Sequence, residues 1–261
     1  MSVEVKTKDD TLFNDPPEGQ SQRQKAIRLI AVCAWVISCS YVVLYLSLGL
    51  KALALFNAVF AGLYAILAII NKQSFFSLGF QFRGYKDDLT LGIFLGAGIV
   101  GLGFGSLYVF NFLSVESIKF SFNNHILYMF IFFLLAVVEE ASLRGFMLKN
   151  LSRSMNKYIA LVLSSLAYVY LQVNIGVTGV NLNMIAVKGI VSLLNFFLFG
   201  ILLGLYCIYR NNLWFPIGLN FSWNYLKGPV CNFWNYHPGM NAIFSHNLNA
   251  IEFENSILLT A

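Results

Sequence analysis

The chain has 261 residues, of which 58% are hydrophobic and only 11% are charged, with a formal net charge of +5. A soluble domain carries about 25% charged residues, so this composition excludes an ordinary soluble protein and predicts a membrane protein. The basic residues flank apolar runs and form no patch, so the expected surroundings are a lipid bilayer and no nucleic acid.

The order of polar and apolar segments predicts three parts. Residues 1–26 are polar and contain no apolar signal segment, so we expect a disordered cytoplasmic tail. Residues 27–227 predict an all-α, polytopic transmembrane bundle, because crossing hydrocarbon takes about 20 apolar residues. Residues 228–261 form a C-terminal tail in which 251–259 resemble the start of a further helix. About seven membrane helices are predicted, at 29–50, 52–70, 91–113, 126–148, 158–175, 189–209 and 213–226.

The last of these runs is short and contains Pro216, so it is expected to be tilted, broken or buried inside the bundle. Most lysines and arginines fall on one side when the N-terminus is placed in the cytoplasm. The positive-inside rule therefore predicts a multi-pass integral membrane protein with a cytoplasmic N-terminus. A bacterial inner membrane fits this topology.

Glycines are concentrated in the third predicted helix. Residues 96–101 match the G-x-G-x-x-G string, but no strand precedes them, so a dinucleotide site is not expected. Gly92 with Gly96, and Gly101 with Gly105, instead predict surfaces for close helix packing. The four cysteines show no metal or disulfide spacing and are interpreted as small buried hydrophobic residues.

Two carboxylates and a guanidinium end the fourth apolar run: Glu139, Glu140 and Arg144. Such groups at membrane depth cost several kcal/mol unless they are paired or face water. Glu140 and Arg144 are four residues apart and can form an ion pair on one helix face. Glu139 is rotated by about 100° and lacks that partner, which suits a general base for water. The alternative is that all three form a buried ion network that only fixes the bundle.

Further polar side chains occur at helical spacing in the later runs. Tyr168 and Gln172 are four residues apart, as are Asn220 and Asn224, and Asn195 lies between these pairs in the sequence. Each alone predicts a hydrogen bond between helices. Together with the carboxylates they predict one polar cavity.

The string Glu139-Glu140-x-x-x-Arg144 resembles the first motif of the CAAX-protease and bacteriocin-processing (CPBP, or Abi) family of intramembrane endopeptidases. That family continues with F-x-x-x-H and H-x-x-x-N on later helices. The resemblance extends over about 134–226, and its core is expected at about 126–227. It includes the segments 155–166, 195–204 and 212–224, and the late segment 253–257 is also similar. It implies that the first glutamate activates water for attack on a peptide carbonyl, while the histidines and the asparagine handle protons and stabilise the oxyanion.

The second and third motifs depart from the family pattern. Tyr168 replaces the phenylalanine, Gln172 and Asn220 replace the two histidines, and Asn224 is retained. The amides can still donate hydrogen bonds to an oxyanion. They cannot change charge near pH 7, and losing a general acid or base typically costs about 10²–10⁴-fold in rate. The missing imidazoles also disfavour a metal site, and no cofactor is expected.

Two hypotheses follow. The first is a glutamate-dependent endopeptidase acting on membrane-associated peptides or proteins, slow or altered, with these catalytic residues: Glu139, Glu140, Arg144, Gln172, Asn220 and Asn224. The second is a catalytically inactive relative that serves as a scaffold, immunity or regulatory partner. A transporter is less favoured, because the sequence shows no inverted repeat.

Overall fold

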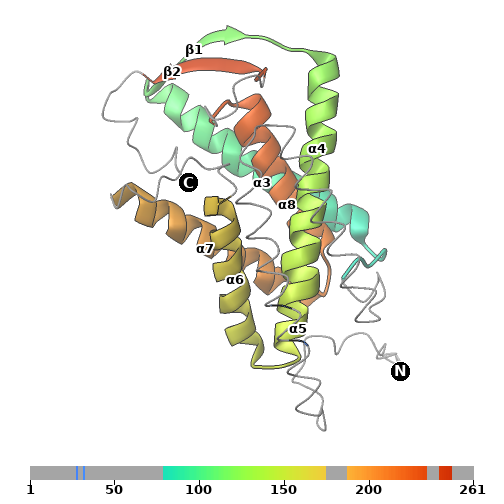
Figure 1. Ribbon diagram of the computed structural model, residues 1–261. Helices are drawn as coiled ribbons and strands as arrows, with labels where there is room; N and C mark the ends of the chain where they lie inside the picture. The colour runs from blue at the N-terminus through green and yellow to red at the C-terminus, as the bar shows by residue number, and fades with distance from the viewer. Residues whose placement is uncertain (1–27, 29–31, 33–78, 175–186, 234–240, 249–261) are drawn as a thin grey trace, which may run out of the picture.

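The computed structural model describes residues 28, 32, 79–174, 187–233 and 241–248. The predicted tail 1–26, most of the runs at 29–50 and 52–70, and the partial helix at 251–259 lie outside these residues. The described elements are α3 (Tyr85–Val109), β1 (Leu113–Ile118), α4 (Phe122–Glu140), the π-helix η2 (Ala141–Leu148), α5 (Lys149–Ser152), α6 (Lys157–Asn174), α7 (Val187–Arg210), α8 (Trp214–Tyr225), the π-helix η3 (Leu226–Val230) and β2 (Phe244–Leu248). Figure 1 shows α3 and α8 crossing beside the long α4, while α6 packs against α7 and against η2 and α5 at the other end of the long helix.

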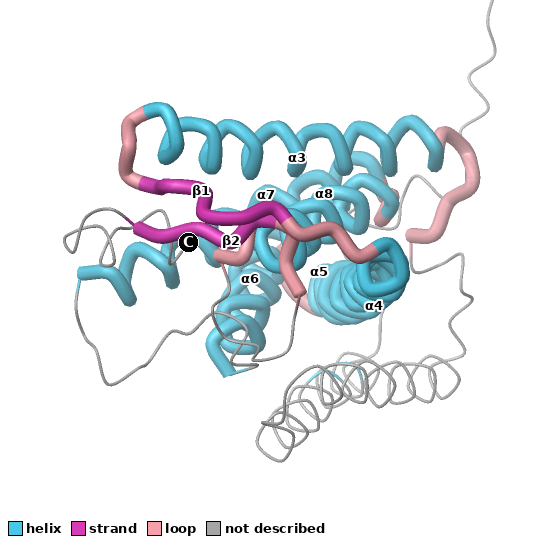
Figure 2. The backbone as a smooth tube through the Cα atoms, turned by 90° about the horizontal axis from the view of Figure 1, so that it is seen from above, coloured by secondary structure: helices cyan, strands magenta, loops and turns pink. Residues whose placement is uncertain are grey.

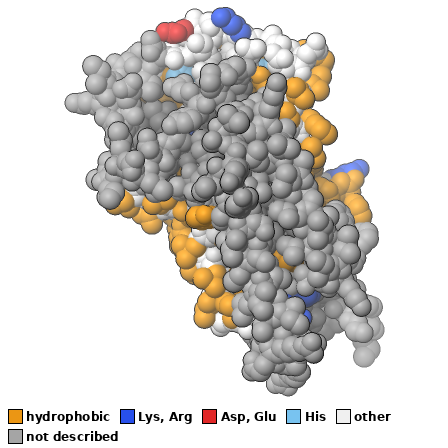
Figure 3. All heavy atoms as spheres, in the orientation of Figure 1, with side chains coloured by type: hydrophobic (Ala, Val, Ile, Leu, Met, Phe, Trp, Pro, Cys, Tyr) orange, Lys and Arg blue, Asp and Glu red, His pale blue; other side chains and the backbone are white. Residues whose placement is uncertain are grey.

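Three described helices are long and apolar enough to cross a membrane: Tyr85–Val109, Phe122–Ser152 and Ile190–Arg210. They coincide with the runs predicted at 91–113, 126–148 and 189–209. Large apolar side chains on their outer faces are exposed, among them Phe94, Phe130 and Leu198, and Figure 3 shows hydrophobic side chains along the flanks of the molecule. A soluble monomer rarely exposes so much apolar surface, whereas lipid solvates it. The chain is therefore an integral membrane protein.

Two further predicted runs form helices that are not among the three candidate spans. The run at 158–175 forms α6, which is helical as predicted but is not among the three candidate spans. The run at 213–226 forms α8, whose 12 residues extend for only about 18 Å. Most of its residues are buried, so of the three alternatives predicted for this run, burial inside the bundle matches the structure. Pro216 lies in its first turn, where a missing backbone N–H breaks no helical hydrogen bond.

Glycine brings α3 and α8 into backbone contact. A Cβ atom on Gly92 would meet the carbonyl oxygen of Phe215, and one on Gly96 would meet the hydroxyl of Ser222. The packing surface predicted from these two glycines is confirmed. The second predicted pair has no such contact within the described part of the chain, where nothing lies within 4 Å of a Cβ built on Gly101 or Gly105. Gly101 is exposed and lies about 140° around α3 from Gly96, so it is not on the face that packs against α8, which lies beside α3 in Figure 2.

A two-stranded sheet is the main departure from the all-α prediction. Strands β1 and β2 pair antiparallel from Leu113 with Leu248 to Ile118 with Phe244, with an irregularity between Val115 and Ser117. The sheet lies over the ends of α3 and α4 in Figure 1. Helix α3 ends at Val109, four residues before the predicted end at 113, and the chain then turns into β1. Part of the predicted C-terminal tail therefore returns to pair with the connection between α3 and α4.

Candidate active site

The paired carboxylates lie where α4 changes from an α-helix to a π-helix. Helix α4 ends with Glu140, and η2 continues from Ala141 to Leu148 with all eight residues buried. A π-helical segment has poorer backbone geometry than an α-helix and is frequent at functional sites. The regular α-helix expected through this motif is therefore replaced by a wider turn that contains Arg144.

The predicted ion pair is present. Arg144 Nη1 donates to Glu140 Oε1 at 2.9 Å, and both side chains are at most 1% exposed. The ring of Tyr168 covers the guanidinium at 4.6 Å from its centroid. Glu140 Oε2 and Arg144 Nη2 are buried and have no hydrogen-bond partner among the residues that the structure describes. A buried polar atom left in that state costs about 1–3 kcal/mol, so both atoms can bind water or a substrate group favourably.

Asn220 joins both carboxylates from α8. Its Nδ2 donates to Glu139 Oε2 at 3.0 Å and to Glu140 Oε1 at 2.9 Å. Its Oδ1 accepts a hydrogen bond from Asn224 Nδ2 at 2.6 Å. The opposite orientation of the Asn220 amide would set its oxygen against two carboxylates, so this network fixes the orientation. Glu139 therefore lacks Arg144 as a partner, as predicted, and has the neutral Asn220 in its place.

The two carboxylates still differ in their surroundings. Glu140 is fully buried and carries the ion pair, whereas Glu139 is 4% exposed. Glu139 uses Oε2 for Asn220, and its Oε1 forms no hydrogen bond with another described residue. Glu139 is thus the carboxylate with an oxygen available to a small molecule such as water.

The amides of Asn220 and Asn224 differ in how many N–H groups remain available for a further hydrogen bond. A primary amide has two N–H groups, and both of those of Asn220 are directed at carboxylates. Asn224 directs one N–H at Asn220, and its second N–H has no partner among the described residues. The expectation that Asn220 would donate to an oxyanion does not fit this geometry, and Asn224 has the free donor.

Gln172 joins the site through Tyr168. Both side chains are buried on α6 and, four residues apart, lie on the same face of the helix. Asn195 is half-buried on α7 and forms no hydrogen bond with another described residue. The structure therefore brings five of the predicted residues together directly and connects Gln172 indirectly. Sequence reasoning listed Tyr168 as polar but missed its contact with Arg144, which joins residues 24 positions apart on different helices.

One comparison with known proteins covers this region. Residues 121–226 match the family model described as type II CAAX prenyl endopeptidase Rce1-like. This segment of the chain is therefore similar to the CAAX protease family. All six predicted site residues lie within the matched segment. No curated protein and no solved structure is significantly similar to the chain.

The described histidines do not take the positions of the two missing family histidines. His125 is buried at the other end of α4, about 21 Å along the helix from Glu139. It stacks on Phe120 at 5.0 Å, and its Nδ1 lies 3.4 Å from the Tyr225 hydroxyl. His246 lies on β2, and His237 lies outside the described residues. Within the described ranges, no three His, Cys, Asp or Glu side chains are grouped so that they could hold a metal ion.

The described cysteines are equally unsuited to catalysis in this CAAX protease relative. Cys207 and Cys231 are both buried free thiols, as predicted for small hydrophobic residues. Burial raises the pKa of Cys231 to about 12, so its thiolate is scarce at neutral pH. Cys33 and Cys39 lie outside the described residues.

Proposed function

We propose that the chain is an intramembrane, glutamate-dependent endopeptidase that hydrolyses a peptide bond of a membrane-associated substrate. The observation that carries this proposal is the difference between the two carboxylates. Glu140 is neutralised by Arg144, while Glu139 is held by Asn220 and keeps one oxygen free for water. A base positioned in this way can take a proton from water as that water attacks a carbonyl carbon.

The remaining residues have separate roles in this mechanism. Water transfers a proton to Glu139 as its oxygen attacks the peptide carbonyl, and the same proton then passes to the leaving amine. The free N–H of Asn224 stabilises the negative oxygen of the tetrahedral intermediate. Asn220 orients both carboxylates, and Gln172 supports Tyr168 over Arg144. Because Gln172 and Asn220 stand where the family has histidines, neither residue can exchange a proton near pH 7, so turnover is expected to be slow.

The substrate class follows from the family name, which specifies a CAAX prenyl endopeptidase. C-terminal C-a-a-X sequences receive a prenyl group on cysteine, which anchors them to membranes. We propose that the substrate is a peptide anchored in this manner. We also propose that this chain is a multi-pass protein of a bacterial inner membrane, with its N-terminus in the cytoplasm. The lipid-exposed helices are consistent with such a substrate arriving through the bilayer.

A second candidate function is supported by one specific observation. The Asn220 amide links both carboxylates without changing charge, which suits a stable polar core as well as a catalytic one. A catalytically inactive relative that binds a membrane partner, as a scaffold, immunity or regulatory protein, would keep this network for folding alone.

Four purified proteins separate the two functions in a peptide-cleavage assay in lipid nanodiscs. They are the wild type, Glu139→Gln, the double variant Gln172→His/Asn220→His, and Glu116→Gln as a control at an exposed carboxylate on β1. The endopeptidase proposal expects Glu139→Gln to lose about 10²–10⁴-fold in rate. Glu116→Gln should retain the wild-type rate. If the wild type and Glu139→Gln behave alike and only the double histidine variant cleaves, the natural chain is the inactive relative.

A further inference from the structure

One buried positive charge has no role in the candidate active site. Lys227 lies in η3, directly after α8, and its side chain is 7% exposed. Its Nζ lies 5.7 Å from the centroid of the Trp223 ring, and it forms no ion pair or hydrogen bond with another described residue. A buried ammonium without a counter-ion costs free energy that a bound anion recovers. Lys227 therefore indicates a site for an anion.

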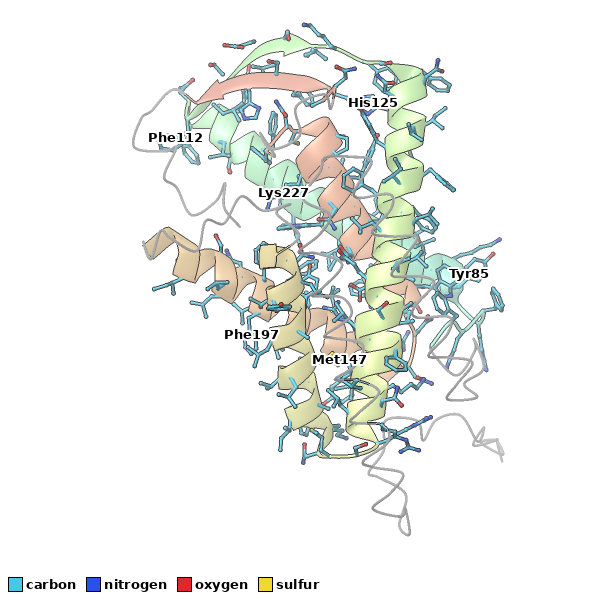
Figure 4. All side chains as sticks on the ribbon, in the orientation of Figure 1. Tyr85, Phe112, His125, Met147, Phe197 and Lys227 are labelled. Atoms are coloured by element: carbon cyan, nitrogen blue, oxygen red, sulfur yellow. The ribbon has the colours of Figure 1, made fainter. Side chains whose placement is uncertain are left out.

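Lys227 lines a cavity of about 120 Å³ between α3 and the end of α8. The rest of the wall is apolar or aromatic and consists of Ile99, Val100, Gly103, Leu107, Trp223 and Phe233. Figure 4 labels Lys227 in this region, between α3 and α7 in the view. The volume corresponds to about four water molecules at about 30 Å³ each, which is room for the four oxygen atoms of a phosphate group. One ammonium in an otherwise apolar wall suits a singly charged anion that carries hydrocarbon.

The cavity lies at the level where the apolar segments of the bundle end. Lys227 is the first charged residue after the apolar run at 213–226. The exposed charges of Glu116 and Lys119 follow the end of α3, and Figure 3 shows charged side chains at that end of the molecule. A tryptophan at the edge of an apolar run, here Trp223, is typical of the boundary between hydrocarbon and lipid headgroups. The anions that occupy this level of a bilayer are lipid phosphates.

The surface of α3 provides an apolar stripe that starts at the cavity. Ile99 lines the cavity and is 42% exposed, so it belongs both to the cavity wall and to the lipid-facing surface. Leu95 and Leu91 precede it at intervals of four residues, which places all three on one helix face, and both are exposed. From Ile99 to Leu91 this face extends for about 12 Å. An acyl chain can therefore lie along α3 while its headgroup occupies the cavity.

We propose that this cavity binds an anionic phospholipid, with Lys227 on the phosphate and α3 along an acyl chain. One ammonium neutralises one phosphodiester. A zwitterionic lipid carries a cation of its own, which the apolar wall would have to desolvate, so the site selects a lipid with a net negative charge. Basic pockets between membrane helices recognise headgroups in this way. The inference stands apart from the proposed endopeptidase function, because it involves none of the candidate catalytic residues.

Quenching of tryptophan fluorescence by lipids brominated on the acyl chain measures this selection, because Trp223 borders the cavity. The full-length wild type is placed in phosphatidylcholine nanodiscs that contain a fixed fraction of brominated phosphatidylglycerol or, in a parallel sample, brominated phosphatidylcholine. We expect the wild type to prefer phosphatidylglycerol by about 10-fold, since a hydrogen bond to a charged group contributes this much. Trp223→Phe identifies the reporter and should lose most of the difference in quenching between the two lipids.

Two kinds of variant separate the charge from the cavity. Lys227→Met removes the charge and should abolish the preference, whereas Lys227→Arg keeps the charge and should retain it. Gly103→Leu keeps the lysine, fills the cavity and should also abolish the preference. Nothing lies within 4 Å of a Cβ built on Gly103 or Gly98, so Gly98→Leu is the matched control outside the cavity. Lys119→Met, at an exposed lysine, is the control for charge. Both controls should behave like the wild type.

Melting curves in phosphatidylcholine alone establish that the variants are folded, and Lys227→Met should be at least as stable there as the wild type, since it removes an uncompensated buried charge. Loss of the lipid preference in Lys227→Met and Gly103→Leu, with both controls unchanged, supports the inference. No preference in the wild type, or an equal preference in Lys227→Met, overturns it. An equal loss in Lys119→Met or Gly98→Leu indicates general surface attraction and also overturns it. If inorganic phosphate displaces the brominated phosphatidylglycerol, the site takes a soluble anion and the lipid assignment is overturned.

Discussion

Helix α8 presents opposite chemistry to its two neighbours. Toward α3 it makes backbone contact through glycine, where Gly92 and Gly96 leave no space for a side chain against Phe215 and Ser222. Toward α4 it presents two amides, Asn220 and Asn224, of which Asn220 binds the carboxylates directly. The first face leaves no space for an added side chain. The second face has one N–H group, on Asn224, that forms no hydrogen bond with another described residue.

The comparison shows how an apolar contact can set the geometry of a polar site. Close packing on α3 fixes the rotation and depth of α8, since no side chain at Gly96 can act as a spacer. That rotation directs Asn220 at Glu139 and Glu140. The glycine face should therefore affect stability when it is changed, whereas the amide face should affect catalysis.

The largest expected loss of stability comes from removing the guanidinium of Arg144, which belongs to the polar site between α4 and α8. Arg144→Met leaves the fully buried Glu140 without its counter-charge, and breaking a buried ion pair typically costs about 3–5 kcal/mol. Thermal unfolding in detergent measures the loss. The double variant Glu140→Gln/Arg144→Met should recover most of it, because no charge remains unpaired. Equal stability of the single and double variants would contradict the assignment of this ion pair.

The next effect tests the amide face alone. Asn224→Ala removes the free N–H that is proposed to stabilise the oxyanion, and such a loss costs about 10²–10³-fold in kcat. The unfolding temperature should fall much less than in Arg144→Met, because Asn220 keeps its bonds to both carboxylates. Comparing kcat with the melting curve of the same preparation checks both expectations. A loss of stability that matched the loss of rate would make Asn224 a structural residue.

The glycine face should respond in stability with a smaller magnitude. Gly96→Ala forces a methyl group against Ser222, and overpacking of this kind costs about 1–3 kcal/mol. Gly101→Ala on the same helix is the matched control, since a Cβ there meets nothing within 4 Å. The control should be neutral or slightly stabilising, because alanine is the better helix former. If both variants unfold at the wild-type temperature, close packing on α3 does not position α8.

The smallest effect is expected at Tyr168. Tyr168→Phe keeps the aromatic ring over Arg144 and should change stability by less than about 1 kcal/mol. Tyr168→Leu removes the cation–π contact and should cost about 1–2 kcal/mol. Chemical denaturation of the two variants side by side measures the difference. A larger loss of stability in Tyr168→Phe would indicate that the hydroxyl and its neighbour Gln172 stabilise the fold more than the ring does.

Local spacing in the sequence was sufficient for several of these features. The i, i+4 relation predicted the pair between Glu140 and Arg144, because a helix brings such residues to one face whatever surrounds it. Apolar runs of about 20 residues predicted the three membrane-length helices, because hydrocarbon thickness sets that length. The motif resemblance predicted the family whose model matches residues 121–226. The catalytic roles of the site residues remain predictions.

Other features depended on contacts between distant parts of the chain. The hydrogen bond from Asn220 to Glu139 joins residues 81 positions apart. No local sequence pattern could therefore predict which acceptors the two N–H groups of Asn220 bind. The pairing of β1 with β2 was missed, although 113–118 alternates apolar and polar residues up to its irregularity, because the partner strand follows more than 120 residues later. Which glycines meet a neighbour was decided by the crossing of α3 and α8, since Gly96 and Gly101 look alike in sequence.

The sequence by itself determined that this protein lies in a membrane, which family its motifs resemble, and that Glu140 pairs with Arg144, since composition, motif and helical spacing are local properties. The tertiary structure decided how Glu139 is held, which amide keeps a free donor, and that Lys227 lines a cavity against α3. Those features depend on the rotation of α8 between α3 and α4. That rotation results from packing across the bundle, which no single segment encodes.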